Sequence, residues 1–226
     1  MKPEPMCRGT AMPSFLLSML LVLISAVSVH AGTPAPWVGL AFDGTACTGG
    51  SAGNFGPYDY TKDKAKLPVV EKRHFTPQVE QLARGETTQD PMGDINYTLV
   101  RFPNHHRALY SAIRHSLGES SAKSKRKYYA ECYLQRAINF SPMDPAPQVL
   151  FGIYLHRLGN LDESLQHYAL AEKMDPNNAN LLYNFGLALF DAGHMEESYQ
   201  YAKRAYEYGM DFPALRRKLQ RAGYWK

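Results

Sequence analysis

This chain of 226 residues is poor in the features that mark most catalytic and metal-binding proteins. It has three cysteines and two tryptophans, and its formal net charge is only +4. So few cysteines exclude a disulfide-dense scaffold, and so mild a charge gives no argument for nucleic acid as a partner. HExxH and CxxC motifs are absent, and no GK[ST] completes a phosphate loop. We therefore expect no enzyme activity, no cofactor and no bound metal.

Long apolar runs are also scarce, and the one that stands out, Phe15–Val29, lies near the N-terminus. Basic Lys2 and Arg8 precede it, and small side chains at positions 29 and 31 suit signal-peptide cleavage. The run is short for a membrane span. We expect residues 1–31 to be a signal peptide that is cleaved near Ala31, leaving no stable membrane span. The alternative is an uncleaved N-terminal membrane anchor.

A repeat with a period of 34 residues occupies the C-terminal third of the chain. It relates residues 145–178 to residues 179–212. The matched positions are mostly small or apolar: Phe151 with Phe185, Gly152 with Gly186, Leu155 with Leu189, Gly159 with Gly193, Ser164 with Ser198, and Ala171 with Ala205. Mid-helix glycine costs roughly 1 kcal/mol relative to alanine, so its recurrence indicates close helix–helix crossings. Gly159 and Gly193 suit left-handed helix C-caps.

The period and the small residues resemble the tetratricopeptide (TPR) repeat. This resemblance implies an all-α fold, a right-handed solenoid of helical hairpins in which neighbouring units stack side by side. Upstream, we expect an altered unit with an insertion at residues 104–144 and a degenerate hairpin at residues 74–103. Downstream, an amphipathic segment with Phe212, Leu215 and Leu219 on one face predicts a capping helix within residues 213–226.

Residues 32–73 differ in composition, being rich in Gly, Pro, Ser and Thr. We expect an extended arm that buries Phe55, Tyr58, Tyr60 and Val69-Val70 against the solenoid. The alternative is a flexible linker, although linkers are usually poor in aromatics. With GPYDYT, HFTPQVEQLARG and GDINYTLVRFPNHHRALYSAIRH, the chain is similar to exported proteobacterial TPR proteins of unassigned function. That similarity implies a periplasmic location and no catalytic residue.

Two of the three cysteines remain after signal cleavage, Cys47 in the arm and Cys132 in the altered unit. An even count in an oxidising compartment predicts a disulfide between them. Closing so long a loop would contribute roughly 4 kcal/mol in the entropic description. The alternative is two separate buried thiols.

The adjacent pair His105-His106 is the most conspicuous group of potential metal ligands. Adjacent helical residues point about 100° apart, so the two imidazoles do not readily share an ion. We expect polar packing instead, with Asn104 capping the helix that follows.

The resemblance to TPR repeats implies that the first helix of each unit lines a concave face, and this groove is the predicted binding site. Its expected residues are Val149, Ile153, His156, Arg157, Asn180, Tyr183, Leu187, Phe190 and Asp191. The stripe is mainly apolar and suits an amphipathic helix or an extended peptide from a protein partner. We expect an interaction module or assembly scaffold of the bacterial cell envelope. The alternatives are a structural subunit of a constitutive envelope complex with no free groove, or a groove filled by the chain's own arm or capping helix.

Overall fold

The computed structural model describes residue 1, residues 35–118 and residues 128–225. The predicted signal peptide beyond Met1, the first residues of the arm and most of the predicted insertion lie outside the described residues. Residues Gly32–Lys226 form one compact unit, and every cluster of buried apolar side chains lies within it. This unit therefore contains the described core of the protein.

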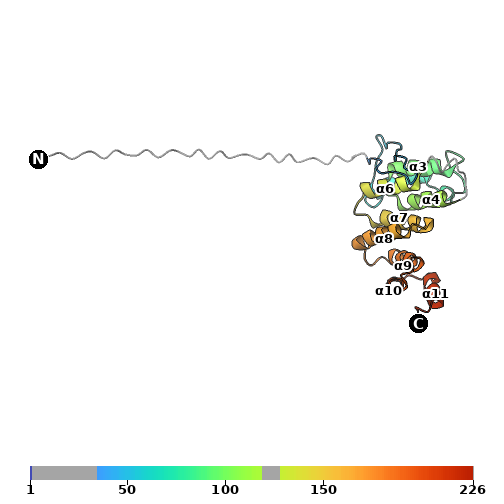
Figure 1. Cartoon of the computed structure of the whole chain (residues 1–226). Coiled ribbons are helices and arrows are strands. Elements are labelled where there is room, and N and C mark those ends of the chain that lie inside the picture. Colours follow the sequence, from blue (N-terminus) through green and yellow to red (C-terminus); the bar gives the residue numbers. More distant parts are fainter. Residues whose placement is uncertain (2–34, 119–127, 226) are drawn as a thin grey trace. The chain divides into compact units, whose positions relative to one another are not determined.

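The described part of the chain is all-helical, as predicted, and its one β-bridge pairs Leu40 with Ala46. Successive helices pack as antiparallel neighbours, α7 on α8 and α9 on α10, and α8 also contacts α9 (Figure 1). The elements are η1 Lys64–Lys66, α1 Leu67–His74, α2 Pro77–Glu80, α3 Pro91–Arg101, α4 His106–Leu117, α6 Ala130–Phe140, α7 Pro145–Leu158, α8 Leu161–Met174, α9 Ala179–Asp191, α10 Met195–Glu207 and α11 Ala214–Arg221. None of the helices within the described ranges is both long and apolar enough to cross a bilayer.

The repeated small residues make the same contacts in both hairpins. Ser164 Oγ donates a hydrogen bond to the Gly152 carbonyl at 2.8 Å, and Ser198 Oγ donates to the Gly186 carbonyl at 2.7 Å. Each serine ties the second helix of its hairpin to the first. Close approach requires the glycine, since a Cβ added at Gly152 would lie 2.8 Å from the Tyr168 ring.

The turns within the hairpins follow the predicted left-handed caps. Gly159 has φ +85° and Gly193 has φ +86°. In both turns the next residue donates its N–H back into the helix, Asn160 to Leu155 and His194 to Leu189, each at 2.9 Å. The positions of these glycines in the sequence therefore predict the geometry of the turns.

The N-terminal part is more helical than expected in one place and less in another. The arm was predicted to stay extended to residue 73, but η1 begins at Lys64 and α1 follows from Leu67, with Pro68 in its first turn and Val70 fully buried. Within the degenerate hairpin expected over residues 74–103, the first helix, α2, is short and ends at Glu80. Leu82 adopts a positive φ of 62°, a conformation that no α-helix continues through.

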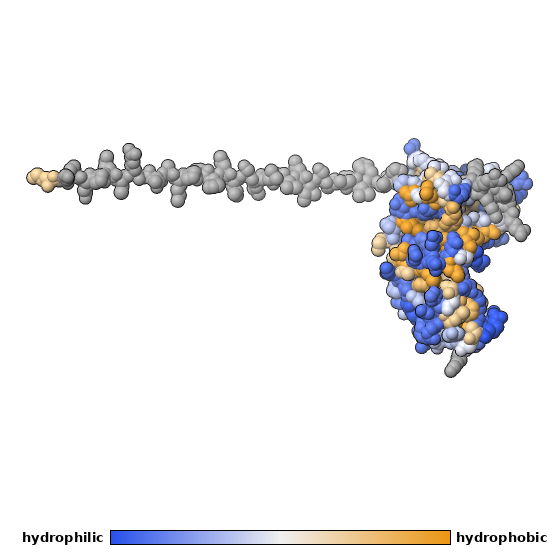
Figure 2. Space-filling model, in the orientation of Figure 1, coloured by the Kyte–Doolittle hydropathy of each residue, from blue (hydrophilic) through white to orange (hydrophobic). Residues whose placement is uncertain are grey.

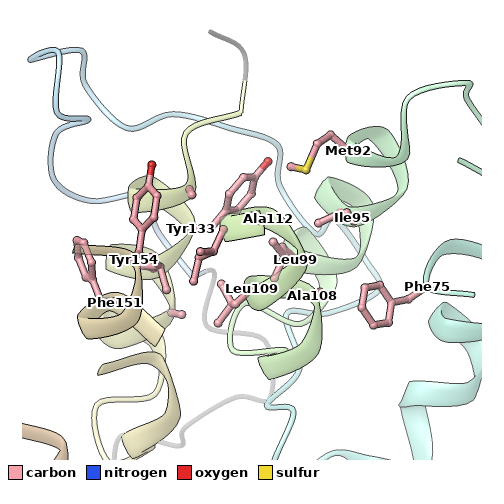
Figure 3. Packing of buried hydrophobic residues seen from close by; sticks show 14 of the residues in the cluster. Phe75, Met92, Ile95, Leu99, Ala108, Leu109, Ala112, Tyr133, Phe151 and Tyr154 are labelled. Atoms are coloured by element: carbon pink, nitrogen blue, oxygen red, sulfur yellow. The ribbon is translucent and has the colours of Figure 1, made fainter. Parts of the chain in front are cut away.

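One large cluster of buried side chains unites this N-terminal part with the repeats. Figure 3 shows Leu99, Leu109, Tyr133 and Phe151, from α3, α4, α6 and α7, gathered in it. Phe75 packs into the same cluster from the end of α1. The altered unit is therefore part of the solenoid core.

The arm is bound to the helices over its described length. Cys47 and Cys132 form a disulfide with a Cα–Cα distance of 5.3 Å, which confirms that pairing. Beside it, the Phe42 N–H donates to Glu131 of α6 at 3.0 Å. Trp37 packs edge-on against Tyr133 at a centroid distance of 5.3 Å. These contacts favour the bound arm over the flexible linker.

The predicted arm anchors are buried to different degrees. Val70 is fully buried, but Val69 is exposed, and Phe55, Tyr58 and Tyr60 are half-buried. A stronger anchor is Arg136, which is 2% exposed and donates to the carbonyls of Ala35, Leu99 and Val100. Two of these carbonyls end α3, where the helix dipole favours a cation. Burial lowers the pKa of Arg136 to about 10, which still leaves it charged at neutral pH.

Asn104 does not cap α4 as expected, because His105 holds that position and accepts from the Ala108 N–H at 3.2 Å. Asn104 instead donates to Asp59 of the arm at 3.0 Å and to Asp144 at 2.9 Å. Burial opposes ionisation of Asp59, but hydrogen bonds from Thr61, Asn104 and Ser141 outweigh it and hold its pKa well below the ordinary value. A buried polar network thus joins the arm to the start of α7.

The capping helix is present and begins at Ala214. Leu215 and Leu219 are fully buried against α9 and α10, as predicted. Phe212, expected on the same face, is 61% exposed because it precedes the helix and does not share its register.

Candidate peptide-binding groove

A cavity of about 440 Å³ opens between α7 and α9, with the start of α4 as its third wall. Its floor and rim are formed by His106, Tyr110, Pro145, Ala146, Val149, Leu150, Ile153, His156, Arg157, Asn178, Asn180, Leu181, Asn184 and Leu187. The α7 members recur at helical spacing, as do Asn180, Asn184 and Leu187 on α9. Two first helices of consecutive hairpins therefore present one continuous surface.

Six of the nine predicted groove residues line this cavity. They are Val149, Ile153, His156, Arg157, Asn180 and Leu187. The apolar members are only partly buried, so the surface remains accessible to another chain.

Tyr183, Phe190 and Asp191 lie elsewhere, which differs from the predicted site. Tyr183 is 8% exposed and belongs to the cluster that includes Leu215 and Leu219 of the capping helix. The Phe190 ring lies 4.8 Å from Lys218 Nζ, also on the capping helix. Helical spacing places Tyr183, Leu187 and Phe190 on one stripe, but α11 covers much of that stripe and leaves Leu187 at the groove. Their spacing alone gave no sign of the cover.

Asp191 connects the groove to the capping helix. Its carboxylate lies 2.9 Å from His156 Nε2 at the groove rim and 2.5 Å from Lys218 Nζ. Burial opposes ionisation of Asp191, but hydrogen bonds from Lys218 and His156 prevail and lower its pKa. Asp191 therefore positions His156 and does not line the cavity itself.

The third wall was not evident from the sequence. His106 Nε2 lies 2.7 Å from the Asp144 carboxylate, which also caps α7 by accepting from the Ala146 N–H. Tyr110, one turn further along α4, is exposed. The sequence signal for this wall was the altered unit, because its first helix, α4, occupies the position that the first helix of a preceding repeat would occupy. Asn178 and Asn184 were likewise missed.

The groove rim contains polar groups without partners in the described chain. The Arg157 guanidinium and the Asn180 side-chain amide form no hydrogen bond or ion pair with other described residues. Side chains of this kind can bind the carbonyl and carboxylate groups of a peptide. Apolar floor and polar rim together suit a peptide segment.

The arm contains one Gly-x-Ser-x-Gly match, Gly49–Gly53, the pattern found around nucleophilic serines. That motif works at a strand-to-helix turn, and here no helix or strand adjoins it. Ser51 Oγ accepts from the Gly53 N–H at 3.2 Å, a local turn bond. The described hydrogen bonds of Ser51 involve no histidine, so the segment has the geometry of a loop.

The histidine pair behaves as packing. His105 is buried and lies 3.0 Å from Glu71, whereas His106 lies against Asp144. The two imidazoles therefore have different partners. Within residues 35–118 and 128–225, no three His, Cys, Asp or Glu side chains converge as metal ligands would.

Comparison with known proteins gives a match to one family. Residues 152–193 match the model of the TPR repeat, a stretch that runs from within α7, through α8, to the turn after α9. No curated protein matches the chain. The matched stretch contains both glycine pairs, Gly152 with Gly186 and Gly159 with Gly193, and groove residues from both α7 and α9. Stacked helical hairpins and this match show that the chain contains TPR repeats, which suggests a protein–protein interaction module.

Proposed function

We propose that the protein is an exported scaffold of the cell envelope that binds an apolar peptide segment of a partner protein between α7 and α9. The observation that carries the proposal is the cavity of about 440 Å³ with its apolar floor. Ile153, Val149 and Leu187 offer surface whose burial would drive association. The unpaired polar groups at the rim would fix the orientation of the bound segment.

The chain's own arm is a rival occupant, and its contacts argue against it. Within its described residues the arm lies against α3 and α6, and its Phe42 stacks on Tyr154 at 5.8 Å. None of the described arm residues lines the cavity. The capping helix lies against Phe190 and Tyr183, beside the groove. An external segment is therefore the better candidate.

Export is part of the proposal. It is supported by the apolar run Phe15–Val29 with its basic start and by a disulfide, which persists in oxidising compartments. Intact-mass measurement of protein from a periplasmic fraction would test it. A full-length chain confined to the cytosol would contradict export without touching the groove.

Leu187→Asp tests the groove, with Leu170→Asp as the matched control. Leu187 lines the cavity, whereas Leu170 is exposed on α8 outside it. Partners are captured from envelope extracts with the wild-type protein, and the affinity of each identified partner is then measured for both variants. Loss of a buried contact at the centre of an interface should weaken binding about thirtyfold or more. The control should bind as the wild type does.

Two results would contradict the groove assignment. One is equal binding by both variants, each verified as folded by circular dichroism. The other is a protein that can be isolated only within a fixed complex whose subunits leave the cavity open, since function would then lie on another surface.

A further inference from the structure

On the outer face of the capping helix α11, every charged side chain is positive. Leu215 and Leu219 point into the core, and the opposite side presents Arg217 and Arg221, both exposed. With Ala214, Lys218 and Gln220 these residues line a shallow depression on the surface. Figure 2 shows strongly hydrophilic side chains at the position of α11 in Figure 1.

Two of these cations have no acidic partner within the described chain. Lys218 pairs with Asp191, and the Arg216 guanidinium lies 4.3 Å from the Tyr206 ring centroid and 4.9 Å from that of Trp225. Arg217 and Arg221 form no ion pair with a described carboxylate. Their charge is available to an external anion.

A cap that served solubility alone would not need this pattern. The exposed faces of α8 and α10 mix both signs, with Asp162, Glu163 and Lys173 on α8 and Glu196, Glu197 and Lys203 on α10. The eight residues of α11 include four cations and no acid. Leu215 and Leu219 already perform the capping, so the basic outer face is left to be explained.

We propose that this face of α11 binds the headgroups of an anionic phospholipid membrane. Arginine guanidinium groups bind phosphate through paired hydrogen bonds. Exposed aromatics bracket the helix in sequence: Tyr208 is 49%, Phe212 61% and Tyr224 44% exposed. Aromatic side chains with a polar tip are enriched at the membrane–water interface. This combination favours a lipid surface over an acidic protein, which would not need exposed aromatics on either side of the basic helix in the sequence.

Vesicle sedimentation tests the proposal with protein that begins at Gly32, so that the apolar N-terminal run does not contribute. The vesicles contain either phosphatidylcholine alone or phosphatidylcholine with roughly 30% phosphatidylglycerol, and salt is kept low so that screening is weak. Wild-type protein should bind the anionic vesicles and be released by raised salt. Arg217→Glu with Arg221→Glu should weaken binding at least about tenfold, because basic residues near an anionic surface each contribute several-fold.

The matched control is Lys173→Glu with Lys203→Glu, which changes the net charge equally on exposed faces of α8 and α10. It should retain most of the binding. Equal losses in the two double variants would show a general charge effect and overturn the proposal, as would the absence of binding by wild type. Tighter binding to a single-stranded oligonucleotide, lost in the α11 variant, would assign the face to a different polyanion. Leu187→Asp should bind vesicles normally, which separates this face from the groove.

Discussion

The two mid-helix glycines offer a matched test of how closely the helices cross, because the repeat equates them while their surroundings differ. A Cβ at Gly152 would lie 2.8, 2.9 and 3.0 Å from three atoms of the Tyr168 ring. Tyr168 is fully buried and stacks on Phe185 at 5.5 Å, so its ring has little room to shift. A Cβ at Gly186 would meet the Leu215 Cδ2 atom at 2.8 Å, the end of a flexible side chain.

Two opposing contributions to the free energy of unfolding determine the effect of each alanine substitution. Alanine gains roughly 1 kcal/mol over glycine within a helix. Overpacking a rigid core costs about 1 to 3 kcal/mol. For Gly152→Ala the overpacking should dominate, with a net loss of about 1 kcal/mol in the free energy of unfolding. For Gly186→Ala, Leu215 can change rotamer, so we expect a result near zero or slightly stabilising.

Urea unfolding followed by far-UV circular dichroism, with the disulfide intact, measures both variants. The difference between them should be about 1 kcal/mol or more, which corresponds to a visibly lower midpoint for Gly152→Ala at unchanged m-value. Stabilisation of both variants by similar amounts would refute the close crossing of α7 and α8 at Tyr168. Equal destabilisation would mean that Leu215 is as rigid as the tyrosine ring.

Two further predictions concern the arm and the pH dependence of stability. Replacing Cys47 and Cys132 with serine should lower the unfolding free energy by about 4 to 5 kcal/mol in the entropic description, since the bridge spans 85 residues. Limited proteolysis should then cut the arm before the repeats, and unchanged resistance of the arm would contradict its dependence on the bridge. Burial lowers the pKa of His105 and of His167, so the unfolded chain binds more protons than the folded one. Stability should be full above the ordinary histidine pKa of about 6.5 and fall as the pH drops below it. His105→Asn, which keeps an N-cap acceptor, should reduce this slope in urea titrations between pH 5 and pH 7.5, and an unchanged slope would exclude His105 as a contributor.

Much of the repeat region was predictable because its determinants are local. Glycine at a left-handed cap and serine facing glycine across a hairpin act within one unit, so the 34-residue period displays them directly. The disulfide followed from counting cysteines in the portion expected after cleavage. The N-terminal part was less predictable, because α1 and the end of α2 depend on Val70 burial and on the unusual backbone of Leu82.

The predicted groove residues also divide into those that sequence spacing relates and those whose exposure depends on tertiary packing. Helical spacing relates Val149 to Ile153 on α7 and Tyr183 to Leu187 on α9, and of these Val149, Ile153 and Leu187 line the cavity. It could not separate Leu187 from Tyr183, because that depends on where α11 crosses α9.

By itself, the sequence determined the repeat, the class of fold and the hairpin turns, since these depend on backbone conformation and on short-range periodicity. Only the tertiary structure decided which apolar stripe stays open, that His106 and Tyr110 form a wall of the groove, and that Arg136 is buried against the end of α3. Those features depend on contacts between segments far apart in the chain. The free energy of such contacts comes from burial and hydrogen bonding across helices, and no local pattern records it.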